Sequence, residues 1–333
     1  MRRRELIGLV GAAAGWPLVA RAQPAPKVYR IAVVHQAHPL GEISEKSPGY
    51  RALFQELRRL GYEEGQNLVV ERYSAEGRQE RFASLSREVV GTNPDLIHAT
   101  SNALVLSFKA ATTTILIVGY MADPDTFGIV TSLARPGGNI TGVSPQPGLD
   151  IWSKRLELLL ETIPSASKVG FLTGTVPRPG LSTIISALQE AAGKARSLVV
   201  PLFHDPIQEA EYRRIMGALF EEKVDGLIVA DYSPNVTHGR LIVDLIDKAR
   251  LPAIYPYRVH FESGGLMAYA VSTTDLWTRM GSYIAQILGG AKPHEMAIYQ
   301  GSTFELLLNL KTAKALGMAF PSTLLARADE VIE

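Results

Sequence analysis

Residues 135–143 read Arg135-Pro136-Gly137-Gly138-Asn139-Ile140-Thr141-Gly142-Val143, a turn that leads directly into a short β-branched strand. Pro136 fixes its own φ and removes a backbone donor, while Gly137 and Gly138 allow backbone angles that other residues avoid. Prolines at positions 145 and 147 then keep the strand from continuing. The same alternation of strands and helices occurs on both sides of this stretch. We therefore expect the chain to leave one α/β lobe here and to enter another.

On the N-terminal side, short apolar runs alternate with amphipathic helices. The runs predict strands at 28–34, 67–73, 95–99 and 115–118, and the helices between them lie near 51–60, 82–90 and 102–110. On the C-terminal side, strands are predicted at 168–172, 198–203, 225–230 and 253–255, with helices near 149–163, 181–194, 208–221 and 237–249. Short connections of this kind require right-handed crossovers and parallel strands. The pattern predicts two doubly wound sheets in tandem. A strand at 266–271 and a helix near 274–288 could then return to the first lobe, and a third crossing would place 304–310 and 311–316 back on the second.

Composition excludes several classes of protein. The chain has 333 residues, of which 46% are hydrophobic and 20% charged, as is usual for a soluble globular protein. A formal net charge of +1 gives no electrostatic reason to expect a nucleic acid as partner. Because there is no cysteine, disulfides, thiolate chemistry and a lipid attached to an N-terminal cysteine are all excluded.

The first 22 residues have the pattern of an export signal. Arg2-Arg3-Arg4 precedes an apolar core that is too short to span a bilayer, and Ala20-Arg21-Ala22 supplies a small-x-small cleavage site. The arginine pair before Glu5 and the weakly hydrophobic core have twin-arginine character. We expect cleavage near Ala22-Gln23 and a periplasmic mature protein, rather than a basic N-terminal helix that stays attached.

Several segments together resemble one family. They are Arg3 to Ile7, Gly61 to Asn67, Arg135 to Val143, Lys154 to Leu159, Asn309 to Gly317 and Leu324 to Glu330. The chain resembles the periplasmic substrate-binding proteins of ABC transporters, in the family whose better-known members bind tryptophan or tyrosine. That resemblance implies the type I periplasmic-binding fold: two Rossmann-like lobes joined by a multi-strand hinge, with a ligand held between them. It also implies a monomer that works with an ABC permease in the inner membrane and carries no cofactor.

The resemblance and the strand pattern together predict how the chain is divided. After the signal at 1–22, we expect residues 27–145 and 272–300 to form the first lobe. Residues 146–271 and 301–333 would then form the second lobe. Two departures from the family pattern fall at the expected cleft. Members often carry an Asn-Pro-Asn type loop where this chain has Thr173-Gly174-Thr175, and a glycine pair near Ser101-Asn102.

Candidate ligand contacts follow from the strand ends. Open α/β sheets bind ligands at the carboxyl ends of their strands, where helix N-termini present free N–H groups. The residues predicted there are Gln36, Thr100, Ser101, Tyr120 and Asp123 in the first lobe, and Thr173, Thr175, Asp231, Tyr232 and Tyr255 in the second. Hydroxyls and helix N-termini hold an anion, a carboxylate holds an amine and tyrosine faces hold a ring. The set fits a small polar or aromatic solute, an amino acid among the candidates.

Each of these residues also has a structural interpretation. Thr100 or Ser101 can serve as a helix N-cap, Asp123 can begin a turn before Pro124, and both Tyr120 and Tyr232 can pack in a wall. Asp231 is the strongest candidate, because it ends a buried apolar strand where no turn requires an acid. We interpret His35-x-x-His38 as polar lining and not as half of a metal site.

No catalytic motif is apparent. The chain lacks a nucleophile elbow, a dinucleotide fingerprint and a phosphate-binding loop, so we predict a binding protein and not an enzyme. Two alternatives stay open at this point. One is an exported α/β enzyme that uses cleft carboxylates such as Asp123 and Asp231. The other is a sensory module that reports the occupancy of its site to a membrane receptor.

Overall fold

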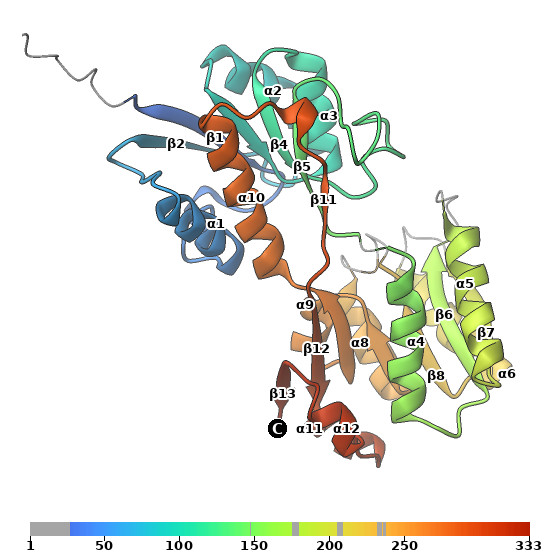
Figure 1. Ribbon diagram of the computed structural model, residues 1–333. Helices are drawn as coiled ribbons and strands as arrows, with labels where there is room; N and C mark the ends of the chain where they lie inside the picture. Colours follow the sequence, from blue (N-terminus) through green and yellow to red (C-terminus); the bar gives the residue numbers. More distant parts are fainter. Residues whose placement is uncertain (1–26, 147, 175–179, 205–208, 232–234, 236–237) are drawn as a thin grey trace, which may run out of the picture.

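The structure, a computed structural model, describes residues 27–146, 148–174, 180–204, 209–231, 235 and 238–333. Its strands form two separate sheets (Figure 1). The first sheet, in the order β11-β5-β4-β3-β1-β2, contains β1 (Tyr29–His35), β2 (Leu68–Ser74), β3 (Leu96–Ala99), β4 (Leu116–Tyr120), β5 (Ile140–Ser144) and β11 (Tyr299–Gln300). The second, in the order β13-β12-β10-β9-β8-β6-β7, contains β6 (Lys168–Gly174), β7 (Leu198–His204), β8 (Gly226–Val229), β9 (Ala253–Tyr255), β10 (Met267–Val271), β12 (Phe304–Asn309) and β13 (Glu330–Ile332). We call each sheet with its helices the first lobe and the second lobe.

Helices cover both faces of each sheet. Those of the first lobe are η1 (Leu40–Glu42), α1 (Pro48–Arg59), η2 (Gln79–Arg81), α2 (Phe82–Gly91), α3 (Asn102–Ala111), α10 (Thr273–Leu288) and η3 (Pro293–Glu295). Those of the second lobe are α4 (Asp150–Thr162), α5 (Leu181–Lys194), α6 (Glu209–Glu222), α8 (Gly239–Lys248), α9 (Arg258–Glu262), α11 (Leu310–Leu316) and α12 (Ser322–Leu325). Among the described residues, every strand pair is parallel except β10 with β12. The predicted α/β fold with two doubly wound lobes is confirmed.

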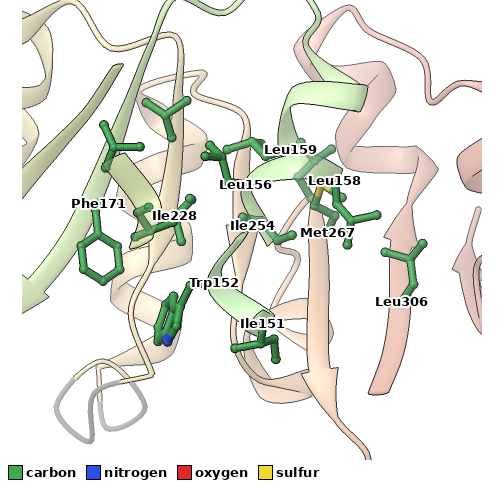
Figure 2. Close-up of a cluster of buried hydrophobic side chains, with 14 of the residues drawn as sticks. Ile151, Trp152, Leu156, Leu158, Leu159, Phe171, Ile228, Ile254, Met267 and Leu306 are labelled. Carbon is green, nitrogen blue, oxygen red and sulfur yellow. The ribbon is translucent and has the colours of Figure 1, made fainter. Parts of the chain in front are cut away.

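Apolar side chains fill a layer on each face of each sheet. In the first lobe, α1 and α10 cover one face, and α2 and α3 cover the other. In the second lobe, α4 and α5 lie on one face, while α6 and α8 lie on the other. Figure 2 shows Leu156 and Leu159 of α4 facing Phe171, Ile228 and Ile254 of the sheet. A strand covered on both faces needs a continuous apolar run, which is the pattern of the predicted strands.

The chain passes between the lobes three times: after β5, after β10 and after β11 (Figure 1). Backbone hydrogen bonds tie these crossings together. The N–H of Gly301 donates to the carbonyl of Ser144 at 3.1 Å, and the N–H of Ser272 donates to the carbonyl of Thr303 at 2.9 Å. Gly301 also packs against Val271, since a Cβ at that glycine would lie 2.3 Å from Val271 Cγ1. The three crossings therefore form one multi-strand hinge.

The stretch that opens the first crossing depends on its glycines. Gly137 and Gly138 have φ values of 73° and 63°, and the hydroxyl of Thr131 closes the turn by donating to the carbonyl of Arg135 at 2.8 Å. Within β5, Gly142 has a φ of 151°, and a Cβ there would lie only 2.0 Å from the carbonyl oxygen of Gly119 in β4. Only glycine lets the two strands approach this closely.

We predict that Gly142→Ala lowers the free energy of unfolding by about 2–5 kcal/mol, because the added methyl group collides with backbone and the left-handed angle is strained. Urea denaturation measures the loss. Gly148→Ala is the matched control on the far side of the same crossing, where no atom lies within 4 Å of the added Cβ. It should change stability by less than about 0.5 kcal/mol. Equal effects of the two substitutions would contradict the close contact.

Candidate functional site

The predicted residues at the ends of β1 and β3 lie together. Thr100 Oγ1 accepts a hydrogen bond from the N–H of Gln36 at 3.3 Å and donates to the carbonyl of Val34 at 3.4 Å. Ser101 caps α3, because its hydroxyl accepts from the N–H of Leu104 at 3.3 Å. The capping role considered for Ser101 is thus present. A hydroxyl oxygen that accepts one hydrogen bond still has a lone pair for a ligand.

The loop after β4 is held against this cluster by Asn102. The side-chain amide of Asn102 donates to the carbonyl of Ala122 at 2.7 Å and accepts from its N–H at 2.8 Å. Asp123 follows in the left-handed region with a φ of 43°. Tyr120 lies with its ring centroid 6.1 Å from that of Trp277, and burial raises the pKa of Tyr120 to about 12. Tyr120 is therefore the last residue of β4, and its side chain packs against Trp277.

In the second lobe, the structure brings two of the predicted residues to one edge. Thr173 is the penultimate residue of β6, Asp231 follows the neighbouring strand β8, and their exposed fractions are 3% and 7%. The hydroxyl of Tyr257 donates to the backbone carbonyl of Asp231 at 3.4 Å. Tyr255 is different, because it is 1% exposed and stacks on His260 within the core. We leave Tyr255 out of the proposed ligand set. The predictions for Thr175 and Tyr232 lie outside the described residues.

A cavity of about 540 Å³ lies between the lobes at one side of the hinge. Its walls come from the segment between β1 and α1, from the start of α10, and from α9 and β12. The lining residues are His38, Ser47, Pro48, Gly49, Tyr50, Arg258, Val259, Glu262, Thr273, Thr274, Trp277 and Glu305. We call it the interlobe cavity. Its volume is in the range of small-molecule sites. The sequence-predicted residues do not line it, although Tyr120 packs on its Trp277.

The first-lobe side of this cavity is aromatic. Tyr50 and Trp277 meet edge to face with ring centroids 4.6 Å apart. Gly49 makes this possible, because a Cβ there would lie 2.6 Å from the indole. The hydroxyl of Tyr50 is buried, and no hydrogen-bond partner for it exists among the described residues. Burial of an unpaired hydroxyl is unfavourable, so Tyr50 is a candidate donor to a solute.

Two histidines pack against this aromatic pair: His98 against Trp277 and His35 against Tyr50. His98 is fully buried, 5.7 Å from the Trp277 ring centroid, and burial lowers its pKa to about 4. His35 stacks on His38 at 3.9 Å, and burial together with the other histidines lowers its pKa to about 3. Across the part of the chain that the structure describes, no three His, Cys, Asp or Glu side chains gather as metal ligands would.

The second-lobe wall of the cavity carries more negative than positive charge. Arg258 pairs with Glu305 at 2.6 Å and also with Glu330 at 2.5 Å, which is outside the cavity. Glu262 is exposed on the same wall. Because Arg258 is shared between two carboxylates, the wall favours a cationic group over an anionic one.

The family of the chain is clear from comparison with known proteins. Residues 47–332 match the family described as "ABC transporter substrate binding protein", and the chain belongs to this family. Proteins of this family bind small-molecule ligands and work with ABC permeases. The family is one of substrate-binding proteins and not of enzymes.

Similar proteins include a tyrosine-binding protein of Clostridioides difficile, 26% identical over 79% of this chain and 74% of that protein. An ABC domain from Streptococcus pneumoniae in complex with L-Trp has a TM-score of 0.75, with 24% identity over 92% of this chain and all of that one. The ligand-free, open structure of a substrate-binding protein with adhesive properties from Clostridium difficile has a TM-score of 0.74. It is 23% identical over 92% of this chain and 99% of that one. These structures show the same fold.

None of the described helices combines the length and apolar character that a membrane span needs. The predicted export signal at 1–22 lies outside the described residues.

We predict that His98 makes the stability of the protein depend on pH. Its pKa of about 4 in the folded state is below the ordinary value of 6.5, so the unfolded chain binds the proton first. Stability is therefore complete above pH 6.5 and falls as the pH drops toward 4. His98→Gln should reduce the loss of unfolding free energy between pH 7 and pH 5 by about 2 kcal/mol.

Urea denaturation at pH 7, 6 and 5 measures this difference. Because each protein is compared with itself at pH 7, any loss of stability caused by the substitution alone cancels. His35 is expected to contribute in the same direction, and its part persists in the variant. His294→Gln is the control, since His294 is exposed. An unchanged pH dependence in His98→Gln would contradict the assignment.

Proposed function

We propose that this protein is the exported solute receptor of an ABC importer. It captures a small polar or aromatic solute between its lobes and delivers it to a membrane permease without transforming it. The observation that carries the proposal is the interlobe cavity, which is bounded by Tyr50 and Trp277 on one side and by acidic residues on the other. Membership in the substrate-binding family supports the same function.

The cavity and the strand ends suit an aromatic amino acid. The partly exposed ring of Trp277, which packs edge to face on the buried Tyr50, offers a place for a ring. Asp231 at the edge of the second sheet, with Glu262 in the cavity wall, suits an ammonium group. Hydroxyls at the starts of α3 and α10 suit a carboxylate, because helix N-termini attract anions. A relative named for tyrosine and a similar structure with L-Trp support this class of solute.

The hinge provides the mechanism. We propose that residues 27–145 with 272–300 move as one body against residues 146–271 with 301–333. A solute that contacts both lobes binds the closed arrangement more tightly than the open one, and so shifts the population toward closure. Delivery then follows from recognition of the closed lobes by the permease. We further propose a signal peptide of the twin-arginine type at 1–22, a mature chain that begins near Gln23, and a periplasmic monomer.

We predict that L-tryptophan or L-tyrosine raises the melting temperature and also compacts the molecule. A ligand that binds only the folded state adds its binding free energy to stability. Closure about the hinge should lower the radius of gyration in small-angle scattering. The control is a non-aromatic amino acid such as glycine, which should do neither. Binding without compaction would argue for a rigid site, and no response to any amino acid would overturn the proposed solute class.

We predict that Asp231→Asn weakens binding of the active amino acid by about 2–5 kcal/mol, because a desolvated ammonium loses its charged partner. The substitution preserves the shape of the side chain, so the fold should survive. Calorimetry measures the affinity. Asp244→Asn, on the exposed face of α8 in the same lobe, is the matched control and should bind as the wild type does. Equal affinities in all three proteins would make Asp231 a structural residue.

A further inference from the structure

Arg258 lies in the wall of the interlobe cavity and is shared between two carboxylates. It is the first residue of α9, and its side chain is 34% exposed. Its Nη2 pairs with Glu305 of β12 at 2.6 Å, and its Nη1 pairs with Glu330 of β13 at 2.5 Å. Glu305 lines the cavity together with Arg258, whereas Glu330 lies outside it. The guanidinium therefore connects the cavity wall to the C-terminal strand.

The backbone places Glu330 independently of this ion pair. β13 pairs parallel with β12, and Glu330 lies opposite Leu307. The preceding residue, Asp329, donates its N–H to the carbonyl of Leu306 at 2.8 Å, and its carboxylate accepts from the N–H of Leu306 at 2.8 Å. These contacts hold Glu330 beside the strand that carries Glu305. A substitution that removes only the charge of Glu330 should therefore leave β13 in place.

The charges around Arg258 do not cancel. Arg258 supplies one positive charge, whereas Glu305, Glu330 and the exposed Glu262 one turn further along α9 supply three negative charges near pH 7. Both Nη atoms of the guanidinium already donate to carboxylates. An incoming anion must therefore compete with a carboxylate of the protein for Arg258, while an incoming ammonium meets an excess of negative charge.

We propose that Glu330 is a positioning residue that sets the specificity of the interlobe cavity. From outside the cavity it occupies one side of the Arg258 guanidinium, which is then not free to bind a solute that carries a carboxylate alone. The cavity therefore selects amines and amino acids over simple carboxylic acids of the same shape. Glu330 acts through Arg258 and does not touch the solute. This inference rests on the proposed function, because it places the solute in the interlobe cavity.

An ion pair between partly exposed side chains can also be a structural contact with little effect on binding. The two roles differ in what they change. Loss of a structural contact would alter the affinity of every solute in the same direction. Loss of the charge on Glu330 would improve the binding of an acid and weaken that of an amine, because the sign of the interaction is opposite for the two. The ratio of the two affinities therefore separates a role in specificity from a structural one.

The experiment compares two probes that share an indole ring. Tryptamine carries an ammonium group without a carboxylate, and indole-3-propionate carries a carboxylate without an ammonium group. Calorimetry at low ionic strength, where charges are least screened, gives the ratio of their dissociation constants in each protein. In Glu330→Gln, the ratio should move in favour of indole-3-propionate by about threefold to tenfold. Glutamine preserves the shape of the side chain and the backbone pairing of β13, so the variant should fold.

Two further variants serve as controls. Glu333→Gln removes the same charge from an exposed position just beyond β13, and should leave the ratio at its wild-type value. Arg258→Gln removes the cation through which Glu330 acts. Adding Glu330→Gln to Arg258→Gln should therefore move the ratio no further. A shift of the same size in that background would reflect net charge alone and would overturn the role of Glu330.

The outcomes distinguish this inference from the proposed function. If L-tryptophan or L-tyrosine binds while the ratio in Glu330→Gln equals that in Glu333→Gln, the proposed function stands and the role of Glu330 is overturned. Equal losses of affinity for both probes in Glu330→Gln would make the residue structural, which also overturns the role. If only the probes bind, the proposed solute class fails and the ratio still decides the role of Glu330. If no amino acid and no probe binds the wild type, the solute class and this inference fail together.

Discussion

The hydrogen bonds between the three interlobe crossings are the constraint on which the rest of the architecture depends. Gly301 bonds to Ser144 and Ser272 bonds to Thr303, so the lobes are joined along one narrow edge. Each lobe has apolar layers on both faces of its own sheet and needs no partner to complete its core. Surfaces that are not required for the core are available for a ligand. The interlobe cavity lies next to the hinge, because Thr273 and Thr274 in its lining directly follow the second crossing.

Buried polar groups that are hydrogen-bonded within the protein maintain the fold, whereas buried polar atoms without a partner are candidates for binding a ligand. Asn102 makes two hydrogen bonds to Ala122, and Ser101 caps its helix, so these groups are satisfied without a ligand. Tyr50 and Arg155 each leave a buried atom without a partner among the described residues. Such atoms are uncommon in folded proteins because each is unfavourable. The Tyr50 hydroxyl lies beside the interlobe cavity, and this position is part of the structural basis for the proposed solute site.

Most of the fold could be predicted from the sequence, because its signals are local. Continuous apolar runs mark strands buried on both faces, and the run at 168–172 became β6 with two further residues. The elements that were missed are short: α9 has five residues, α12 four, β13 three and β11 two. Helical periodicity needs several turns to be visible, and a two-residue strand exists only through its pairing with β5. No local pattern reports a pairing that depends on the rest of the fold.

The sequence could predict site residues only where they lie at the end of a clearly predicted strand. Asp231 was placed at a sheet edge because its strand is a clear apolar run, whereas Tyr255 ends a strand of three residues and turned out to face the core. Trp277 was missed because α10 reaches α1 from a distant part of the chain, and that packing leaves no trace in either segment. Arg155 lies in a sequence that looks like an ordinary charged helix, and its burial becomes apparent only in three dimensions.

Under the proposed function, the distribution of charge would make closure of the lobes easier. In the second lobe, Glu305 is paired with Arg258, which also pairs with Glu330. A carboxylate that has a cation within its own lobe keeps that compensation whether the cleft is open or closed. Closure over an empty site then strips water from a charge that is already partly balanced, which lowers the desolvation penalty. An incoming ammonium adds to this balance instead of creating it. Under the proposed function, specificity would therefore come chiefly from the ring beside Trp277 and from the hydroxyl of Tyr50, with Asp231 selecting for charge.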